Sequence, residues 1–288
     1  MAFQFADSYL CKFMSRKLFV ITGPTAAGKT DEATRLAQEL ACPILSADSR
    51  QVYKELNIGV ARPTEEQLAT VQHYFIAHIS IHEPYNAGRY AMEGRHLINA
   101  LFEQHEHLVI CGGTGLYIQA LLQGLDRLPG RNDELRAELD KKLAERGIES
   151  LQAELKSLDI ERYQLIDIQN PQRLIRAIEI LKTPLGDEPE LPGFKHHFET
   201  EIIKILPDRE VLYQRINQRV HQMMKDGLEE EAKNLAAFKN LNALQSVGYN
   251  EWWPYFRGEC TKAEVMDKIQ QHTRNYAKRQ MTWIRHKM

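Results

Sequence analysis

The sequence has little cysteine and no long hydrophobic run, and both features limit what the protein can be. No stretch approaches the roughly 18 consecutive apolar residues of a membrane-spanning helix, so we expect no membrane contact. The first 17 residues are interrupted by charged side chains and contain no apolar segment of signal-peptide length. The four cysteines form no C-x-x-C pair. This argues against a zinc site or a disulfide framework and favours reduced thiols in a cytoplasmic protein.

A strong overall charge is also missing. The 288 residues carry a net charge of −2, and 43% are hydrophobic, as expected for one large globular domain with an appendage. The charge is nevertheless uneven: from His272 onward the chain has five Lys and Arg residues, including Lys278 and Arg279, and no acidic residue. Tyr276 and Trp283 are interleaved with them. This segment is either a helix that contacts a phosphate backbone or a terminal helix whose aromatics pack inward.

The most informative motif is a phosphate-binding pattern near the N-terminus. An apolar, β-branched run over residues 18–22 precedes the spacing G-x-x-x-x-G-K-T, and a helix is predicted over 31–40. Glycines let successive backbone N–H groups turn toward one anion, and the helix N-terminus adds positive potential. The lysine neutralises phosphate charge, and the threonine hydroxyl is a ligand for Mg²⁺. The candidate diphosphate- or nucleotide-binding residues are therefore Gly23, Pro24, Thr25, Ala26, Ala27, Gly28, Lys29 and Thr30, with Thr30 as the metal ligand.

Polar clusters follow two further strand-like runs, residues 43–47 and 107–111. The first run ends at Asp48-Ser-Arg-Gln51 and the second at a glycine-rich turn that contains Thr114. A fourth run, residues 201–206, is most simply a strand of the same sheet. Strands that alternate with helices predict an α/β fold: a P-loop NTPase-like parallel sheet with helices on both faces. Since ligands bind beyond the carboxyl ends of such strands, we expect the three clusters to form one site.

The region 129–197 differs in character from the rest of the chain. Helices are predicted over 134–146 and 172–182, the second begun by Asn170-Pro171, and no strand pattern occurs between them. A loop rich in Pro, Gly and charge follows. We therefore predict an inserted, all-helical subdomain in a catalytic core formed by residues 14–128 and 198–288. Residues 1–13 show no pattern that would dock them and are expected to be a dispensable tail.

Three residues are candidates for the chemistry, each with a simpler alternative. Asp48 is placed to act as a general base or to hold Mg²⁺ through water, or else to cap the next helix together with Ser49. Thr114 offers a hydroxyl to a phosphate, or is only a turn residue. Arg219 is placed to stabilise a leaving diphosphate, or belongs to a solvated helix face.

Six segments together resemble the tRNA dimethylallyltransferase (tRNA isopentenyltransferase) family, in the family's order and over nearly the whole chain. They are Gly23–Thr30; Ser46–Tyr53 with Ile58–Pro63; Gly112–Tyr117; Asn170–Ala177; Val247–Tyr249; and Ala277–Trp283. The chain differs from the family in a short segment after Lys182 with few basic residues. It also has no zinc-finger extension of the eukaryotic kind after Trp283, so a bacterial-type enzyme is expected.

The resemblance implies transfer of a dimethylallyl group from its diphosphate to N6 of adenosine 37, next to the tRNA anticodon, with Mg²⁺. It implies that residues 25–30 hold the diphosphate, that Asp48 is the general base, and that Thr114 and Arg219 assist the leaving group. We expect a cytoplasmic monomer that binds the anticodon stem-loop. The expected tRNA contacts are Asp48, Ser49, Arg50, Gln51, Arg136, Gln172, Arg173, Leu174, Ile175 and Arg176, with Lys278 and Arg279 of the basic segment.

Other functions remain open at this point. A small-molecule kinase shares the phosphate loop but does not need the helical insertion. An adenylate isopentenyltransferase performs the same chemistry on a free nucleotide. A non-catalytic nucleotide-binding module would leave Asp48 and Thr114 without a task.

Overall fold

The computed structural model describes residues 16–186, 191–194, 196 and 198–288, so the predicted tail over residues 1–13 lies outside it. The described chain forms two compact units. A core unit comprises the chain up to Gly124 and from Gly193 onward, and a helical unit comprises Leu125–Pro192. Within the described residues, no helix combines the length and apolar character needed to cross a membrane.

A five-stranded parallel sheet forms the centre of the core unit, in the order β3-β2-β4-β1-β5. Its middle strand pair, β1 and β4, aligns Lys17 with His107 and Thr22 with Gly112. The strand expected over residues 201–206 does join this sheet, paired with β1, although it starts two residues earlier. The strands are β1 (Lys17–Thr22), β2 (Ile44–Ser46), β3 (His73–Tyr74), β4 (His107–Gly112) and β5 (Glu199–Lys204).

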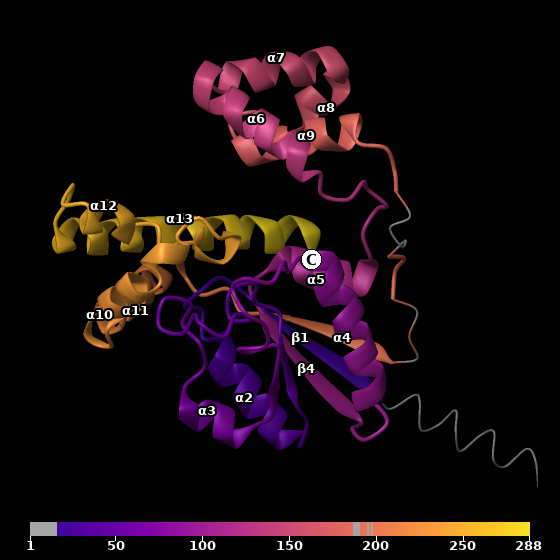
Figure 1. Cartoon of the computed structure of the whole chain (residues 1–288). Helices are drawn as coiled ribbons and strands as arrows, with labels where there is room; N and C mark the ends of the chain where they lie inside the picture. Colours follow the sequence, from indigo (N-terminus) through magenta and orange to yellow (C-terminus); the bar gives the residue numbers. More distant parts are fainter. Residues whose placement is uncertain (1–15, 187–190, 195, 197) are drawn as a thin grey trace, which may run out of the picture. The chain divides into compact units, whose positions relative to one another are not determined.

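Helices cover both faces of the sheet, as the alternating pattern predicts. Figure 1 shows α2 and α3 on one side and α4 on the other. Apolar side chains of α2 pack against the central strands in a cluster that includes Ala33, Ile44 and Val109. The core helices that precede β5 are α2 (Lys29–Glu39), α3 (Glu65–Thr70), α4 (Ala87–Leu101) and α5 (Gly115–Gln123).

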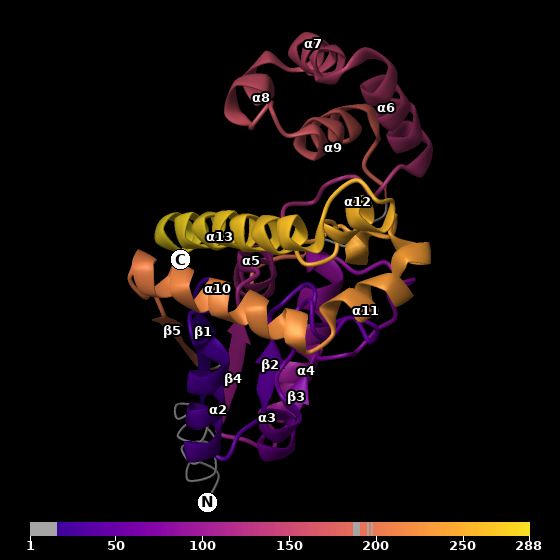
Figure 2. The ribbon, with the colours of Figure 1, turned by 90° about the vertical axis from the view of Figure 1, so that its left-hand side faces the viewer.

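The chain after β5 is helical and lies over the carboxyl ends of the strands. Figures 1 and 2 show α13 crossing this end of the sheet, with α10 alongside it. Leu212 and Ile216 of α10 pack with Ala26 of the phosphate loop and Ala277 of α13, and all four are buried. The elements are α10 (Arg209–Lys225), α11 (Leu228–Asn234), the 3₁₀ turns η1 (Ala236–Phe238) and η2 (Asn242–Leu244), α12 (Trp252–Phe256) and α13 (Lys262–Lys287).

The helical unit has a core of its own, formed by Leu139, Leu151, Leu155, Leu174, Ile175, Ala177 and Ile178. The unit spans Leu125–Pro192, compared with the predicted 129–197. Its two ends are joined by an antiparallel bridge between Leu125 and Leu191. Asn170 caps the last helix as expected, accepting from the N–H groups of Gln172 and Arg173. The helices are α6 (Asp133–Arg146), α7 (Ile148–Leu158), α8 (Ile160–Leu165) and α9 (Pro171–Lys182).

Candidate active site

A cavity of about 590 Å³ opens at the carboxyl ends of the strands in the core unit. The phosphate loop lines one side, and the turn after β2 lines another. Two predicted clusters, residues 25–30 and Asp48–Gln51, therefore meet in one cavity, as the parallel topology requires. Its other walls come from Gly59–Thr64, from α10, from the segment 245–250 and from α13.

The phosphate loop has the expected geometry. It leaves β1 at Thr22 and enters α2 at Lys29 through Gly28, whose φ of 93° is left-handed and suits glycine. The N-terminus of α2 therefore points its free N–H groups into the cavity, which favours an anion there. Gly23 and Pro24 do not line the cavity; the Pro24 carbonyl instead accepts a hydrogen bond from the Lys29 ammonium at 2.7 Å.

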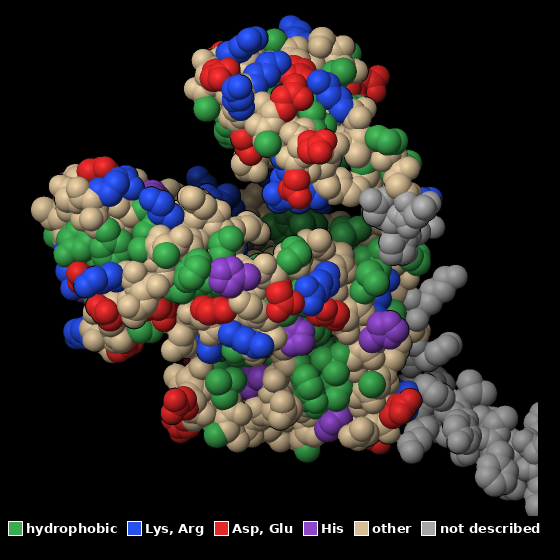
Figure 3. All heavy atoms as spheres, in the orientation of Figure 1, with side chains coloured by type: hydrophobic (Ala, Val, Ile, Leu, Met, Phe, Trp, Pro, Cys, Tyr) green, Lys and Arg blue, Asp and Glu red, His purple; other side chains and the backbone are tan. Residues whose placement is uncertain are grey.

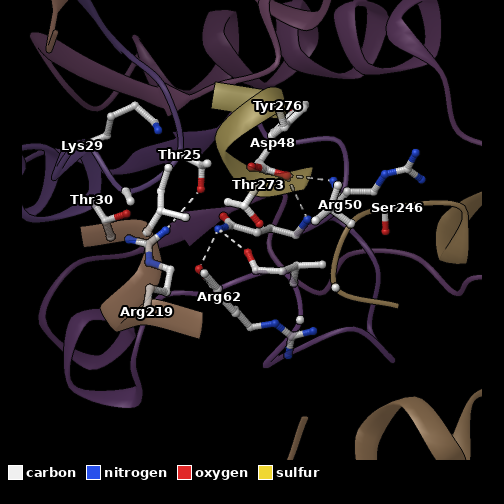
Figure 4. Close-up of a pocket in the computed structure, with 18 of the residues that line it drawn as sticks. Thr25, Lys29, Thr30, Asp48, Arg50, Arg62, Arg219, Ser246, Thr273 and Tyr276 are labelled. Atoms are coloured by element: carbon white, nitrogen blue, oxygen red, sulfur yellow. Dashed lines mark hydrogen bonds between the residues drawn. The ribbon is translucent and has the colours of Figure 1, made fainter. Parts of the chain in front are cut away.

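Two cations meet at this end of the cavity without a carboxylate partner. Figure 4 shows Lys29 and Arg219 on the same side, with Thr25 between them. Arg219 donates to the Thr25 hydroxyl at 3.3 Å, and neither cation forms an ion pair within the described chain. Both side chains are partly buried, and burial lowers the pKa of each. Two desolvated cations that form no ion pair within the described residues are costly, and an anion that paired with both would be stabilised here.

Asp48 lies across the cavity from these cations (Figure 4). Its Oδ1 accepts from the N–H groups of Arg50 and Gln51, at 2.9 and 3.3 Å, which fixes the carboxylate in a turn. No helix follows it, so the alternative role as a helix cap is wrong. Within the described residues, no hydrogen bond engages its Oδ2. The second oxygen is available to take a proton from a ligand.

Thr114 follows β4 at the same edge of the sheet but is not among the residues that line this cavity, and its expected contact with the leaving group stays a prediction. It is the N-cap residue of α5, and its hydroxyl accepts from the Ser49 N–H at 3.0 Å. The Thr114 side chain also hydrogen-bonds Tyr276. Thr114 thus supports the turn next to Asp48.

Two residues of α13 complete the site, and their positions were not predicted. Gln280 is buried; it accepts from the Thr25 N–H at 2.8 Å and donates to the Gly113 carbonyl at 2.9 Å. It thereby joins the phosphate loop to the loop after β4. Tyr276 lies beside Asp48 in Figure 4, and burial raises its pKa to about 12, so it is protonated at neutral pH. Local sequence gave no signal for either contact, since Gln280 is 255 residues from Thr25.

The basic C-terminal segment is a helix with an aromatic residue packed inward, as the second alternative predicts, and its contact with a phosphate backbone stays a prediction. Arg279 lines the cavity and its guanidinium lies 5.7 Å from the centre of the Tyr276 ring, while Lys278 is exposed. Trp283 packs inward: a Cβ atom built on Gly115 would lie 2.1 Å from its indole nitrogen. Helix α13 therefore packs one face against the core and carries its Lys and Arg side chains on its other faces.

Two arginines predicted to contact tRNA are held in the helical unit by one acidic residue. Glu179 is fully buried, and its carboxylate accepts from Arg136 at 2.7 and 2.8 Å and from Arg176 at 2.6 Å. The Asn132 N–H also donates to it, at 2.8 Å. These bonds lower the pKa of Glu179 to about 2 in spite of its burial. One negative charge against two guanidinium groups leaves the cluster with a net positive charge.

Not every position in the predicted range 172–176 can contact tRNA through its side chain. Leu174 and Ile175 are 0% and 1% exposed in the core of the helical unit, so their inclusion was wrong. The helical period turns them inward while Gln172 and Arg173 stay exposed. Figure 3 shows Lys and Arg side chains interspersed with Asp and Glu over the visible face of this unit. On this face positive charge is therefore mixed with negative charge.

Comparison with known proteins decides the family. The family model described as IPP transferase matches residues 51–287. The chain belongs to this family. A tRNA dimethylallyltransferase of Cytophaga hutchinsonii is 43% identical over 94% of this chain and 90% of its own length. That of Flavobacterium johnsoniae is 42% identical over 93% and 90%. A crystal structure of the full-length tRNA isopentenylpyrophosphate transferase of Bacillus halodurans matches with a TM-score of 0.68 and 34% identity, covering 94% of this chain and 88% of that one.

Membership of the IPP transferase family confirms three predictions. These are the resemblance itself, the enzyme class, which is prenyl transfer, and the P-loop NTPase-like α/β fold. The family model starts at residue 51, after the phosphate loop and Asp48. The curated relatives extend further, because 94% coverage leaves too few residues unmatched to omit the phosphate loop. Both halves of the cavity therefore belong to the part of the chain that is shared with these relatives.

Proposed function

We propose that this IPP transferase family member transfers the dimethylallyl group of dimethylallyl diphosphate to N6 of adenosine 37 in tRNA. One observation carries the proposal: among the described residues, Lys29 and Arg219 form no ion pair at one end of the cavity, and no hydrogen bond engages Asp48 Oδ2 at the other. A diphosphate matches the first feature. An amino group that must lose a proton matches the second.

An apolar surface adjoins the cation pair and suits a five-carbon allyl group. Ile216 and Val220 of α10 and Ile269 of α13 line the cavity and are at most 2% exposed. Ile216 and Val220 flank Arg219 on one face of α10, so the apolar tail and the diphosphate head of one donor molecule reach neighbouring residues. Burying a group of this size contributes about 2–3 kcal/mol to donor binding.

The residues of the site account for the transfer. The lone pair on N6 attacks C1 of the allyl group, the bond from C1 to the diphosphate oxygen breaks, and its electrons leave with the diphosphate. Asp48 accepts the N6 proton, which matters because the lone pair of an exocyclic amine is delocalised into the ring. Lys29, Arg219 and the N–H groups of the phosphate loop stabilise the charge that develops on the diphosphate. Adenosine 37 must leave its stack to reach Asp48.

The donor set fits Mg²⁺. The Thr30 hydroxyl and the Asp31 carboxylate line the cavity beside the phosphate loop. Mg²⁺ is usually held by one or two protein oxygens together with phosphate oxygens and water, so no larger cluster of acidic residues is needed. We propose that Thr30 holds the ion, which would supply further charge stabilisation to the diphosphate.

For tRNA binding we propose Ser49, Arg50 and Gln51 beside the cavity, Lys278 and Arg279 of α13, and Gln172, Arg173, Arg136 and Arg176 of the helical unit. Arg136 and Arg176 would present the positive charge that remains beside Glu179. A tRNA substrate also makes the cytoplasm the expected location, and we propose that one chain suffices for the reaction.

A parallel incubation separates this function from that of a kinase. Wild-type protein is given unmodified tRNA and Mg²⁺ with either dimethylallyl diphosphate or ATP, and the digested nucleosides are analysed by mass spectrometry. We expect dimethylallyladenosine with the first donor and no phosphorylated product with the second. Phosphate transfer from ATP to tRNA or to a nucleoside, without prenyl transfer, would overturn the proposal.

A further inference from the structure

One wall of the cavity, residues 59–63, is held by several side chains: Arg62 bonds the carbonyls of the segment 53–56, Gln51 bonds the wall from the Asp48 turn, and Glu231 of α11 anchors its first residues. Glu231 of α11 accepts from the N–H groups of Ile58 at 2.8 Å and Gly59 at 3.0 Å. Its Oε1 also accepts from the Tyr249 hydroxyl at 2.6 Å. Three hydrogen-bond donors from two separate segments thus bond to the Glu231 carboxylate. The proposed reaction gives this carboxylate no chemical role.

Packing reinforces these hydrogen bonds. Tyr249 is fully buried, and a Cβ atom on Gly59 would lie 2.5 Å from its ring, so only glycine allows this approach. Gly248 has a left-handed φ of 99°, and a Cβ atom there would lie 3.0 Å from the Gly59 carbonyl oxygen. The two segments Ile58–Pro63 and Val247–Tyr249 are therefore parts of one structure. The mechanism above gives neither of them a role.

The wall is connected to Asp48 through Gln51. The Gln51 amide donates to the carbonyls of Val60 and Ala61 at 3.3 and 2.9 Å, and the Gln51 N–H donates to Asp48 Oδ1 at 3.3 Å. Ala61 has a φ of 48°, an unfavourable conformation for alanine that these contacts hold in place. Hydrogen bonds and the short backbone segment 59–61 thus connect Glu231, through Gln51, to the carboxylate that faces the acceptor.

The phosphate loop is fixed by other residues. Its contacts run from Thr25 to Gln280 and Arg219, and from Lys29 to Pro24. Loosening the wall should therefore shift Asp48 and the acceptor side of the cavity, and leave the donor side in place.

We propose that Glu231 and Tyr249 are positioning residues for the acceptor base: they fix the wall at residues 59–63 and, through Gln51, the orientation of Asp48. This inference rests on the proposed function. A displacement of about 1 Å between reacting groups costs on the order of 100-fold in rate. Loss of the hydrogen bonds to Glu231 is therefore expected to lower kcat.

The chain supplies a matched control on the same helix. Glu229 of α11 accepts from the Tyr255 hydroxyl at 3.1 Å and pairs with Lys262 at 2.6 Å, and none of the three lines the cavity. Glu231→Gln and Tyr249→Phe are therefore compared with Glu229→Gln and Tyr255→Phe. All four variants keep the size of the side chain and remove only a charge or a hydroxyl.

Steady-state kinetics and hydrogen exchange are measured on the full-length variants well below their thermal midpoints. We expect Glu231→Gln to lower kcat at least tenfold and Tyr249→Phe several-fold, with KM for the diphosphate donor within twofold of wild type. The controls should stay within twofold throughout. Amide exchange over residues 57–63 should accelerate at least tenfold in Glu231→Gln and remain unchanged in Glu229→Gln.

Two results would overturn the proposal: unchanged exchange over residues 57–63, or faster exchange with normal kcat. A lower thermal midpoint without a change in kcat would show a purely structural role. If the wild-type protein modifies no tRNA, the proposed function fails. Faster exchange in Glu231→Gln would then still show that this residue fixes the wall, and unchanged exchange would refute that as well.

Discussion

Replacing Glu179 with glutamine is expected to destabilise the helical unit by about 2–3 kcal/mol. The Glu179 carboxylate is fully buried and accepts four hydrogen bonds, from Asn132, Arg136 and Arg176. Glutamine keeps the shape but supplies one oxygen instead of two, and it turns an amide N–H group toward a guanidinium. The change leaves two guanidinium groups without their counter-charge, which is the costly way to break a buried pair.

The magnitude follows from the pKa of Glu179, which the arginines lower from 4.5 to about 2. Each pKa unit corresponds to about 1.4 kcal/mol, so the ionised form contributes roughly 3 kcal/mol. Arg136 and Arg176 keep 20% and 34% of their side-chain surface in water, which lowers this value somewhat. Because the folded-state pKa is lowered, the contribution is complete above about pH 5 and disappears as the pH falls toward 2.

The positions of the tryptophans make the assay selective. Trp252, Trp253 and Trp283 all belong to the core unit, so their fluorescence reports that unit alone. At pH 7, Glu179→Gln should lower a thermal transition seen by far-UV circular dichroism by roughly 10–20 °C and leave the fluorescence transition unchanged. The control Glu145→Gln, which removes an exposed partner of Lys141 at 3.9 Å, should change stability by less than about 0.5 kcal/mol. Equal midpoints for Glu179→Gln and wild type at pH 7 would refute the reasoning.

Two further predictions concern the substrates. Lys29→Ala should weaken binding of dimethylallyl diphosphate and lower turnover, with the tRNA Kd, measured by filter binding, within twofold of wild type; a large loss of tRNA affinity would contradict this. Arg173→Ala should flatten the slope of log K for tRNA against log salt by about 0.7–0.9, because Arg173 is exposed and its nearest acidic partner, Asp167, lies 3.8 Å away. An unchanged slope would show that Arg173 does not reach a phosphate.

The parts of the site that depend on residues close together in the sequence, or on the parallel strand order, were predictable. Strand, glycine turn and helix follow one another within residues 17–39, so the local pattern is enough to predict this order of elements. The meeting of Asp48 with the phosphate loop follows from parallel strands, whose carboxyl ends share one edge. The start of β5 was less predictable, because its pairing with Lys17 sets the first residue and its own apolar run does not.

The parts of the site formed by residues that are far apart in the sequence were not predictable. Gln280 and Tyr276 belong to a helix that the sequence marks as basic, aromatic and similar to the family, but their contacts arise only where that helix packs on the strand ends. The hydrogen bond from the Ser49 N–H to the Thr114 hydroxyl was not predictable for the same reason, because the two residues are 65 positions apart. Arg176 and Glu179 are three residues apart in one helix, so their pairing was visible in the spacing and was overlooked.

The most direct test of the account is a single-turnover reaction of wild type and Asp48→Asn with saturating dimethylallyl diphosphate and unmodified tRNA. The product is digested to oligonucleotides and mapped by mass spectrometry. We expect one dimethylallyl group, on adenosine 37 alone, formed at least about 100-fold more slowly by the variant, with the tRNA Kd changed by less than a few-fold. Equal rates in the two proteins, or the group on another nucleotide, would contradict the account.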